Sequence, residues 1–151
     1  MENNGDKIYF DDVAEQESFE FGSYLLNKAE VIEFARQWDP QPFHVDEAAA
    51  KASVFGGLTA SSLHLFAICT KLFALYRPSF AILAMLGKDQ IKIPAPAGPG
   101  DTLTYRSTCI SKKVSQSKPD RGVIVLSDEL SKQDGTVVLM QTVTLMLARR
   151  T

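Results

Sequence analysis

The spacing of hydrophobic residues changes along the chain from a short alternating stretch to a helical period and then back to alternation. Phe19 and Phe21 alternate with polar residues in the segment Ile8–Ser23, which predicts a lead-in followed by a first strand. The longest helical period covers Leu58–Tyr76, and its apolar residues recur every three or four positions. They are Leu58, Leu65, Phe66, Cys69, Leu72, Phe73 and Tyr76. The breadth of this stripe predicts a deeply buried helix.

Two shorter helices are expected between the first strand and the long helix. Asn27 and Glu30 have the spacing of a capping box, and the helix that they start must end near Trp38, because Pro40 disfavours helical geometry at Asp39. The segment Asp39–Asp46 is then a proline-stiffened loop. Asp46 is a suitable N-cap for a second short helix over Glu47–Ala52.

From Phe80 onward the period moves toward two, which predicts strands. Gln133-Asp134-Gly135 is a strong signal for a hairpin between the last two strands. The segment Val137–Leu147 is expected to form a long apolar strand edge, which another chain must cover. One strand, then helices, then four long strands indicates an α+β fold in which one long helix lies on an antiparallel sheet. The four strands are placed at Ala81–Lys92, Asp101–Ser117, Gly122–Gln133 and Thr136–Ala148.

Composition narrows the classes of protein that the chain can belong to. Its 151 residues fit a single domain, 1–151, and 45% hydrophobic with 23% charged residues is ordinary for a globular protein. The net charge is −2 and the basic residues are scattered, so nucleic acid is not an expected partner. We expect no membrane span and no signal peptide. Cys69 and Cys109 show no metal-ligand spacing, and we interpret them as reduced and buried in a cytoplasmic protein.

Asp39 and His44 are the first candidates for chemistry. An imidazole titrates near neutrality, and a carboxylate five residues away on a stiff loop can be held beside it. Such a pair can take a proton from water and return it to carbon. The alternative is structural: Asp39 only ends a helix and His44 lies on a surface turn.

The second candidate is the entry into the long helix. Gly56-Gly57 precedes it, and Ser61 and Ser62 follow. Unpaired N–H groups at the start of a helix suit an anion or a developing enolate oxygen. Alternatively, the glycines only let the chain enter a crowded helix, and the serines pack inside it. His64, further along, is expected to be a hydrogen-bonded packing residue.

Taken together, the segment Asp39–Ser62 resembles the hydratase motif of MaoC-like dehydratases and (R)-specific 2-enoyl-CoA hydratases. In that motif an Asp precedes Asn-Pro-x-His-x-Asp, and a Phe and a His-Gly pair follow. The matching residues here are Asp39, Pro42, His44, Asp46 and Phe55. Two positions depart from the motif, because Gln41 replaces its Asn and Ser61-Ser62 replaces its His-Gly.

The resemblance implies a hot-dog fold and a hydro-lyase that reversibly adds water to a trans-2-enoyl thioester, with Asp39 and His44 as the catalytic pair. The backbone N–H of Ser62 is then the oxyanion donor. The substrate-binding surface is expected to include Gly57, Ser61 and Gln41, and the pocket to include Phe43 and Phe55.

The same resemblance implies the assembly and the partners. It implies a homodimer, or a larger oligomer built from dimers, in which two sheets join edge to edge around shared tunnels. The substrate is an acyl-CoA or acyl-carrier thioester of fatty acid metabolism, and no metal or redox cofactor is required. One alternative is a hot-dog thioesterase, although Leu58–Tyr76 has no acidic residue to attack a thioester. The other is an acyl-thioester binding module without turnover.

Overall fold

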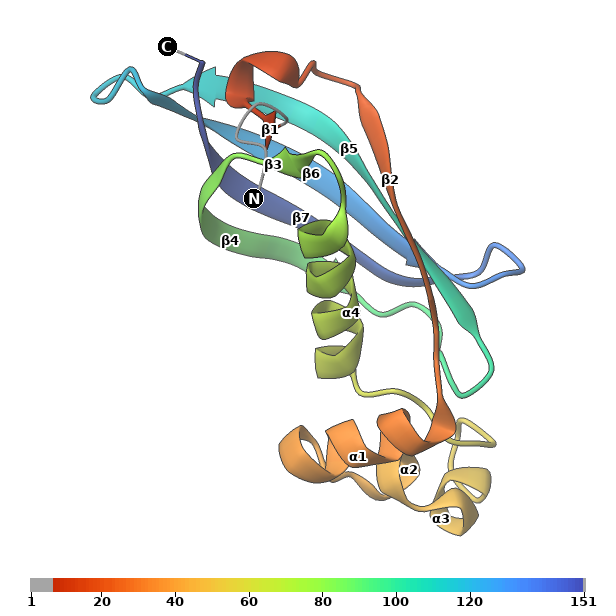
Figure 1. Ribbon diagram of the computed structural model, residues 1–151. Coiled ribbons are helices and arrows are strands. Elements are labelled where there is room, and N and C mark those ends of the chain that lie inside the picture. Colours follow the sequence, from red (N-terminus) through yellow and green to blue (C-terminus); the bar gives the residue numbers. More distant parts are fainter. Residues whose placement is uncertain (1–6, 151) are drawn as a thin grey trace.

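A curved antiparallel sheet with one long helix against it makes up most of the molecule (Figure 1). The structure is a computed structural model, and it describes residues 7–150. The elements in chain order are β1 (Lys7–Ile8), η1 (Phe10–Asp12), β2 (Ser18–Leu25), α1 (Lys28–Trp38), α2 (Pro42–Val45), α3 (Glu47–Lys51), α4 (Ser62–Leu75), β3 (Ser79–Phe80), β4 (Ile82–Lys92), β5 (Thr102–Val114), β6 (Arg121–Ser131) and β7 (Val137–Ala148).

The main sheet has five strands in the order β2-β5-β6-β7-β4, with every neighbouring pair antiparallel. Buried and more exposed residues alternate along β5, β6 and β7, so one face of the sheet forms the core. Helix α4 packs on that face through Leu65, Ile68, Cys69 and Leu72. This arrangement is the hot-dog fold, and the predicted α+β class is confirmed.

The helices α1, α2 and α3 form a separate group at the N-terminal end of α4 (Figure 1). Both predicted N-caps are present: the Asn27 side chain accepts from the N–H groups of Ala29 and Glu30, and Asp46 caps α3. Two boundaries differ from prediction. The supposed loop Asp39–Asp46 contains the single turn α2, which Pro42 can start because a first helical residue needs no N–H donor.

The long helix also begins later than the sequence predicted, at Ser62 instead of Leu58. The preceding residues are held extended by contacts with distant segments: the Thr59 N–H donates to the Phe43 carbonyl at 3.2 Å and the Ala60 N–H to Ala97 at 2.7 Å. Ser61 is therefore the N-cap of α4. The N–H groups at the start of this helix are those that follow Ser61, and Gly56-Gly57 lies outside the helix.

The apolar sheet edge is β4, and the prediction that Val137–Leu147 forms an edge is wrong. Strand β7 lies between β6 and β4 and pairs with both. Among residues 7–150, strand β4 pairs only with β7, and it leaves several large hydrophobic side chains about half exposed: Ile82, Leu83, Met85, Leu86 and Ile91. Both predicted buried cysteines, Cys69 and Cys109, are free thiols in the core. No helix within residues 7–150 has the length and apolar character to cross a membrane.

Candidate active site

Asp39 and His44 lie side by side where α1 ends and α2 begins. Asp39 is the C-cap of α1, and His44 is in the single turn of α2. The His44 Nε2 atom is 3.4 Å from Asp39 Oδ2. The imidazole is buried, whereas a quarter of the Asp39 side chain remains exposed. The stiff segment thus brings together the carboxylate and the imidazole that the spacing suggested.

The other ring nitrogen of His44 fixes the position of the proton on the ring. His44 Nδ1 is 2.5 Å from the carbonyl oxygen of Thr59. A carbonyl can only accept, so Nδ1 must carry the hydrogen, and in the neutral ring Nε2 is left with a free lone pair. The lone pair of Nε2 and the oxygen Oδ2 of Asp39 are then two acceptors 3.4 Å apart. That arrangement suits a water molecule that donates to both.

Ser61 also contacts the Asp39 carboxylate. Its hydroxyl donates to Asp39 Oδ2 at 2.7 Å and accepts from the Leu63 N–H at 3.2 Å. The side chain is fully buried. Ser61 therefore links the cap of α4 to the carboxylate, and its hydroxyl does not face the cavity that contains His44.

That cavity, of about 370 Å³, lies between α2, the start of α4 and the Ile93–Ala97 segment. Ser62 and Leu65 line it from α4, and His44 lines it from α2. The carbonyl of Ser61 accepts from the N–H groups of His64 and Leu65, and the Leu63 N–H is taken by the Ser61 hydroxyl. Within the described residues, the Ser62 N–H has no such partner, so the first peptide of α4 has a donor to offer at the cavity.

The remaining candidate residues are divided between this cavity and other surfaces. Phe43 and Phe55 line it, with ring centroids 5.1 Å apart. Gln41 is exposed and makes no capping hydrogen bond with its side chain. Gly57 lines a different hollow, between α3 and the turn at Gly98, so the structure does not bring Gly57 to the pair.

Sequence reasoning missed Thr59 and the part that Gly98 plays beside it. Thr59 supplies the carbonyl that orients His44, and no side-chain motif signals a backbone contact of this kind. A Cβ on Gly98 would lie 2.5 Å from the carbonyl oxygen of Leu58, so only glycine lets the two segments approach this closely. The glycine in the sequence at this position could have been used to predict that the chain packs closely here.

His64 belongs to a neighbouring polar cluster and makes no contact with the pair. Its Nε2 lies 3.2 Å from Glu30 Oε1, and its ring stacks on Phe34 at 4.5 Å. The Tyr24 hydroxyl also donates to Glu30 and thereby lowers the pKa of the carboxyl, while the pKa of Tyr24 is raised to about 12. The predicted packing role is confirmed, although His64 Nδ1 is buried without a partner among residues 7–150.

No group of three or more His, Cys, Asp and Glu side chains within the described part of the chain is placed to hold a metal ion. His44 and Ser62 line the cavity, and the Asp39 carboxylate adjoins it through its contact with His44 Nε2. The groups assembled here are one imidazole, one backbone N–H and one carboxylate. These are the parts required to move a proton and to stabilise an oxyanion.

Comparison with known proteins agrees with the fold. Residues 12–129 match the family model described as MaoC like domain. A MaoC-like dehydratase from Rhodospirillum rubrum is 34% identical, with a TM-score of 0.85 over 95% of this chain and 99% of its own. An (R)-hydratase from Pseudomonas aeruginosa, at 18% identity, has a TM-score of 0.78 over 96% of this chain and 88% of its own.

Among curated proteins, the chain is 29% identical to Protein MaoC of Klebsiella aerogenes over 113 residues. The matched part is 73% of this chain and only 33% of that protein, so the chain spans about a third of this relative. The family match covers most of the described residues, and the chain belongs to the MaoC-like domain family.

Proposed function

We propose that this protein is a hydratase, or in reverse a dehydratase, that adds water across the double bond of a trans-2-enoyl thioester. The observation that carries the proposal is the contact of 3.4 Å between His44 Nε2 and Asp39 Oδ2, next to a cavity that Ser62 lines at the start of α4. Membership of a family that includes dehydratases supports the same reaction class.

In the proposed reaction, a water molecule lies beside the pair, within hydrogen-bond reach of both His44 Nε2 and Asp39 Oδ2. Nε2 accepts a proton from the water while the water oxygen bonds to the β-carbon of the enoyl group. The electron pair of the double bond moves toward the thioester carbonyl, and the Ser62 N–H stabilises the resulting enolate oxygen. The proton on His44 then returns to the α-carbon, so one water has been added and the pair is restored.

Each neighbour of the pair has a distinct task in this scheme. The Thr59 carbonyl keeps the proton on Nδ1, so that Nε2 faces the water as a base. Asp39 orients the water and stabilises the imidazolium that forms beside it. Ser61 is a positioning residue, because it fixes the Asp39 carboxylate through the bond of 2.7 Å and touches no substrate atom. No metal or redox cofactor is needed for these steps.

The active assembly is proposed to be a homodimer that forms along β4. Within the described residues, β4 pairs on one side and exposes a row of apolar residues. Such an edge is normally covered by another strand, and a second copy of the chain can supply it. CoA and an acyl carrier protein present the same reacting group, so the proposed reaction is the same on either carrier. Buried free thiols at Cys69 and Cys109 fit a cytoplasmic location.

A panel of trans-2-enoyl-CoA substrates of increasing chain length tests the reaction. We expect loss of the ultraviolet absorbance of the conjugated thioester and formation of a 3-hydroxyacyl-CoA whose thioester bond stays intact. Release of free CoA thiol without hydration would indicate a thioesterase instead. Tight binding of enoyl-CoA without any turnover would indicate a binding module, and either result would refute the proposed function.

A further inference from the structure

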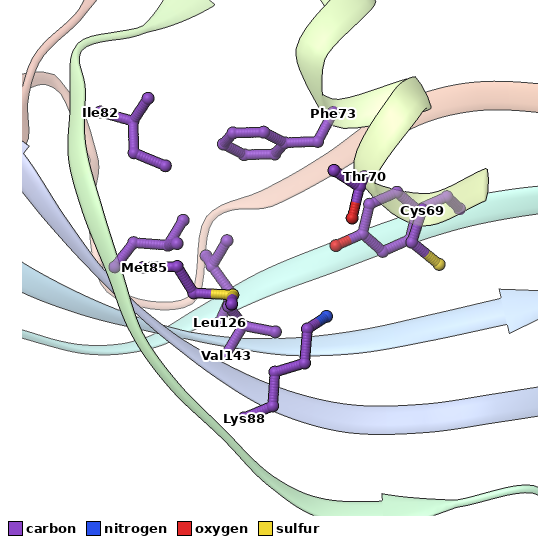
Figure 2. Close-up of a pocket in the computed structure, with 10 residues that line it drawn as sticks. Cys69, Thr70, Phe73, Ile82, Met85, Lys88, Leu126 and Val143 are labelled. Atoms are coloured by element: carbon purple, nitrogen blue, oxygen red, sulfur yellow. The ribbon is translucent and has the colours of Figure 1, made fainter. Parts of the chain in front are cut away.

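A second cavity lies between α4 and the inner face of the sheet. It measures about 220 Å³ and is mainly apolar, with one lysine, Lys88 of β4, in its lining (Figure 2). An engineered cavity of about 150 Å³ accommodates benzene, so this one has room for about nine non-hydrogen atoms. The other lining residues are Cys69, Thr70, Phe73, Ile82, Met85, Tyr105, Leu126, Val143 and Leu145.

The Lys88 ammonium is the polar group in this lining with donors to spare. The Thr70 hydroxyl already donates to the Phe66 carbonyl at 3.0 Å, and the Tyr105 hydroxyl to Asp128 at 2.7 Å. Lys88 Nζ donates to Gln141 Oε1 at 3.3 Å and lies 5.3 Å from the centre of the Phe66 ring. An ammonium has three N–H donors, and the described residues place no carboxylate within 4.0 Å of this one.

One buried carboxylate near Lys88, that of Asp128, is already occupied. Its Oδ1 accepts from the Ser107 hydroxyl, and its Oδ2 accepts from Tyr105 and from the Gln141 amide at 2.9 Å. Lys88 is linked to Asp128 by hydrogen bonds through the Gln141 amide, and no direct ion pair joins the two among the described residues. A carboxylate that entered the cavity would give Lys88 the direct partner that it lacks.

The two cavities follow one another along α4. Leu65 lines the cavity next to His44, and Cys69 lines the second cavity. Residues four apart lie on the same face of a helix, about 6 Å along its axis. An acyl chain whose thioester sits at Ser62 would reach the second cavity by running along α4 in this direction.

We propose that Lys88 determines substrate specificity by binding a carboxylate at the far end of a short acyl group, which makes dicarboxylic enoyl thioesters the preferred substrates. This proposal rests on the hydratase function proposed above. It goes further by naming the class of acyl group and the residue that selects it. The apolar walls hold the methylenes, and the Lys88 ammonium holds the terminal carboxylate.

The test compares trans-2-hexenoyl-CoA with the CoA monothioester of trans-2-hexenedioic acid, which has the same carbon count and one added carboxylate. We expect kcat/KM to favour the dicarboxylic substrate by about ten- to a hundredfold, since a hydrogen bond to a charged group has this strength. Lys88→Met should remove the preference mainly by raising KM for the dicarboxylic substrate, and Lys88→Arg should retain it. Lys92→Met, which removes an exposed lysine of the same strand, should leave the preference unchanged.

The outcomes separate the two proposals. If the wild-type protein hydrates the neutral substrate as well as or better than the dicarboxylic one, the role of Lys88 is refuted while the hydratase function stands. If neither substrate is hydrated, the proposed function fails and the substrate class fails with it. Should Lys88→Met not fold, Lys88→Gln keeps a polar contact with Gln141, and an unchanged preference in that folded variant would equally overturn the proposal.

Discussion

Replacing Ser61 by alanine is expected to slow the reaction more than it weakens the fold. The change removes the hydroxyl that donates to Asp39 Oδ2 at 2.7 Å and that accepts from the Leu63 N–H. Loss of an N-cap costs about 1 kcal/mol of unfolding free energy. Water can reach the partly exposed Asp39 carboxylate and replace part of the lost bond, so the total loss should be about 1–2 kcal/mol.

The effect of Ser61→Ala on catalysis follows from the freedom that Asp39 gains. A hydrogen bond to a charged group contributes about 1.5–3 kcal/mol, and a tenfold change in rate corresponds to about 1.4 kcal/mol. If most of this energy is used to orient the carboxylate, kcat should fall about ten- to a hundredfold with little change in KM. Ser61→Thr keeps both the hydroxyl and the cap, and it should retain most of the activity.

Steady-state kinetics and thermal unfolding on the same preparations check this prediction. Asn27→Ala is the matched control, because it removes the N-cap of α1 at a similar cost in stability and does not contact the pair. That variant should lose stability and keep its kcat. A folded Ser61→Ala protein with the wild-type kcat would refute the positioning role of Ser61.

Three further predictions address assembly, the oxyanion donor and the response to acid. The protein should have at least a dimeric mass at micromolar concentration in sedimentation or light scattering, and a monomer would contradict pairing along β4. Ser62→Gly should retain activity and lose about 1 kcal/mol of stability, whereas Ser62→Pro deletes the N–H and should lower kcat about 10²–10³-fold if circular dichroism shows it folded. The lowered pKa of Glu30 means that the unfolded chain binds more protons below the ordinary value of 4.5, so stability should fall as the pH drops through that region. In Glu30→Gln, the unfolding free energy from denaturant titrations should depend less on pH in this region. An unchanged pH dependence would show that Glu30 does not contribute to it.

The sequence was sufficient to predict the class of fold and the neighbourhood of the candidate pair. Alternation and helical period reflect burial on one face, and these patterns are local. The pair could be anticipated because Pro40 and Pro42 stiffen the few residues that join Asp39 to His44. Their proximity follows from chain geometry over one short segment.

Long-range contacts explain what the sequence could not show. The start of α4 is set by hydrogen bonds from Thr59 and Ala60 to segments far along the chain, so helical period alone placed it four residues early. Ser61 and Asp39 are 22 residues apart, and nothing in the local sequence links their side chains. Lys88 lies on a strand whose neighbours could not be ordered by pattern, so its position in a cavity became visible only in the folded sheet.

The most direct test of the central claim, that Asp39 and His44 act together on one water molecule, is a double-mutant cycle. The kcat/KM for one good enoyl-CoA substrate should be measured for the wild type, Asp39→Asn, His44→Ala and the double variant, with folding checked by circular dichroism. Each single change should lower kcat/KM by about 10²–10⁴-fold, and the double variant should be little worse than the worse single one, because the two groups act as a unit. Full activity in Asp39→Asn, or single effects that simply multiply in the double variant, would contradict the account.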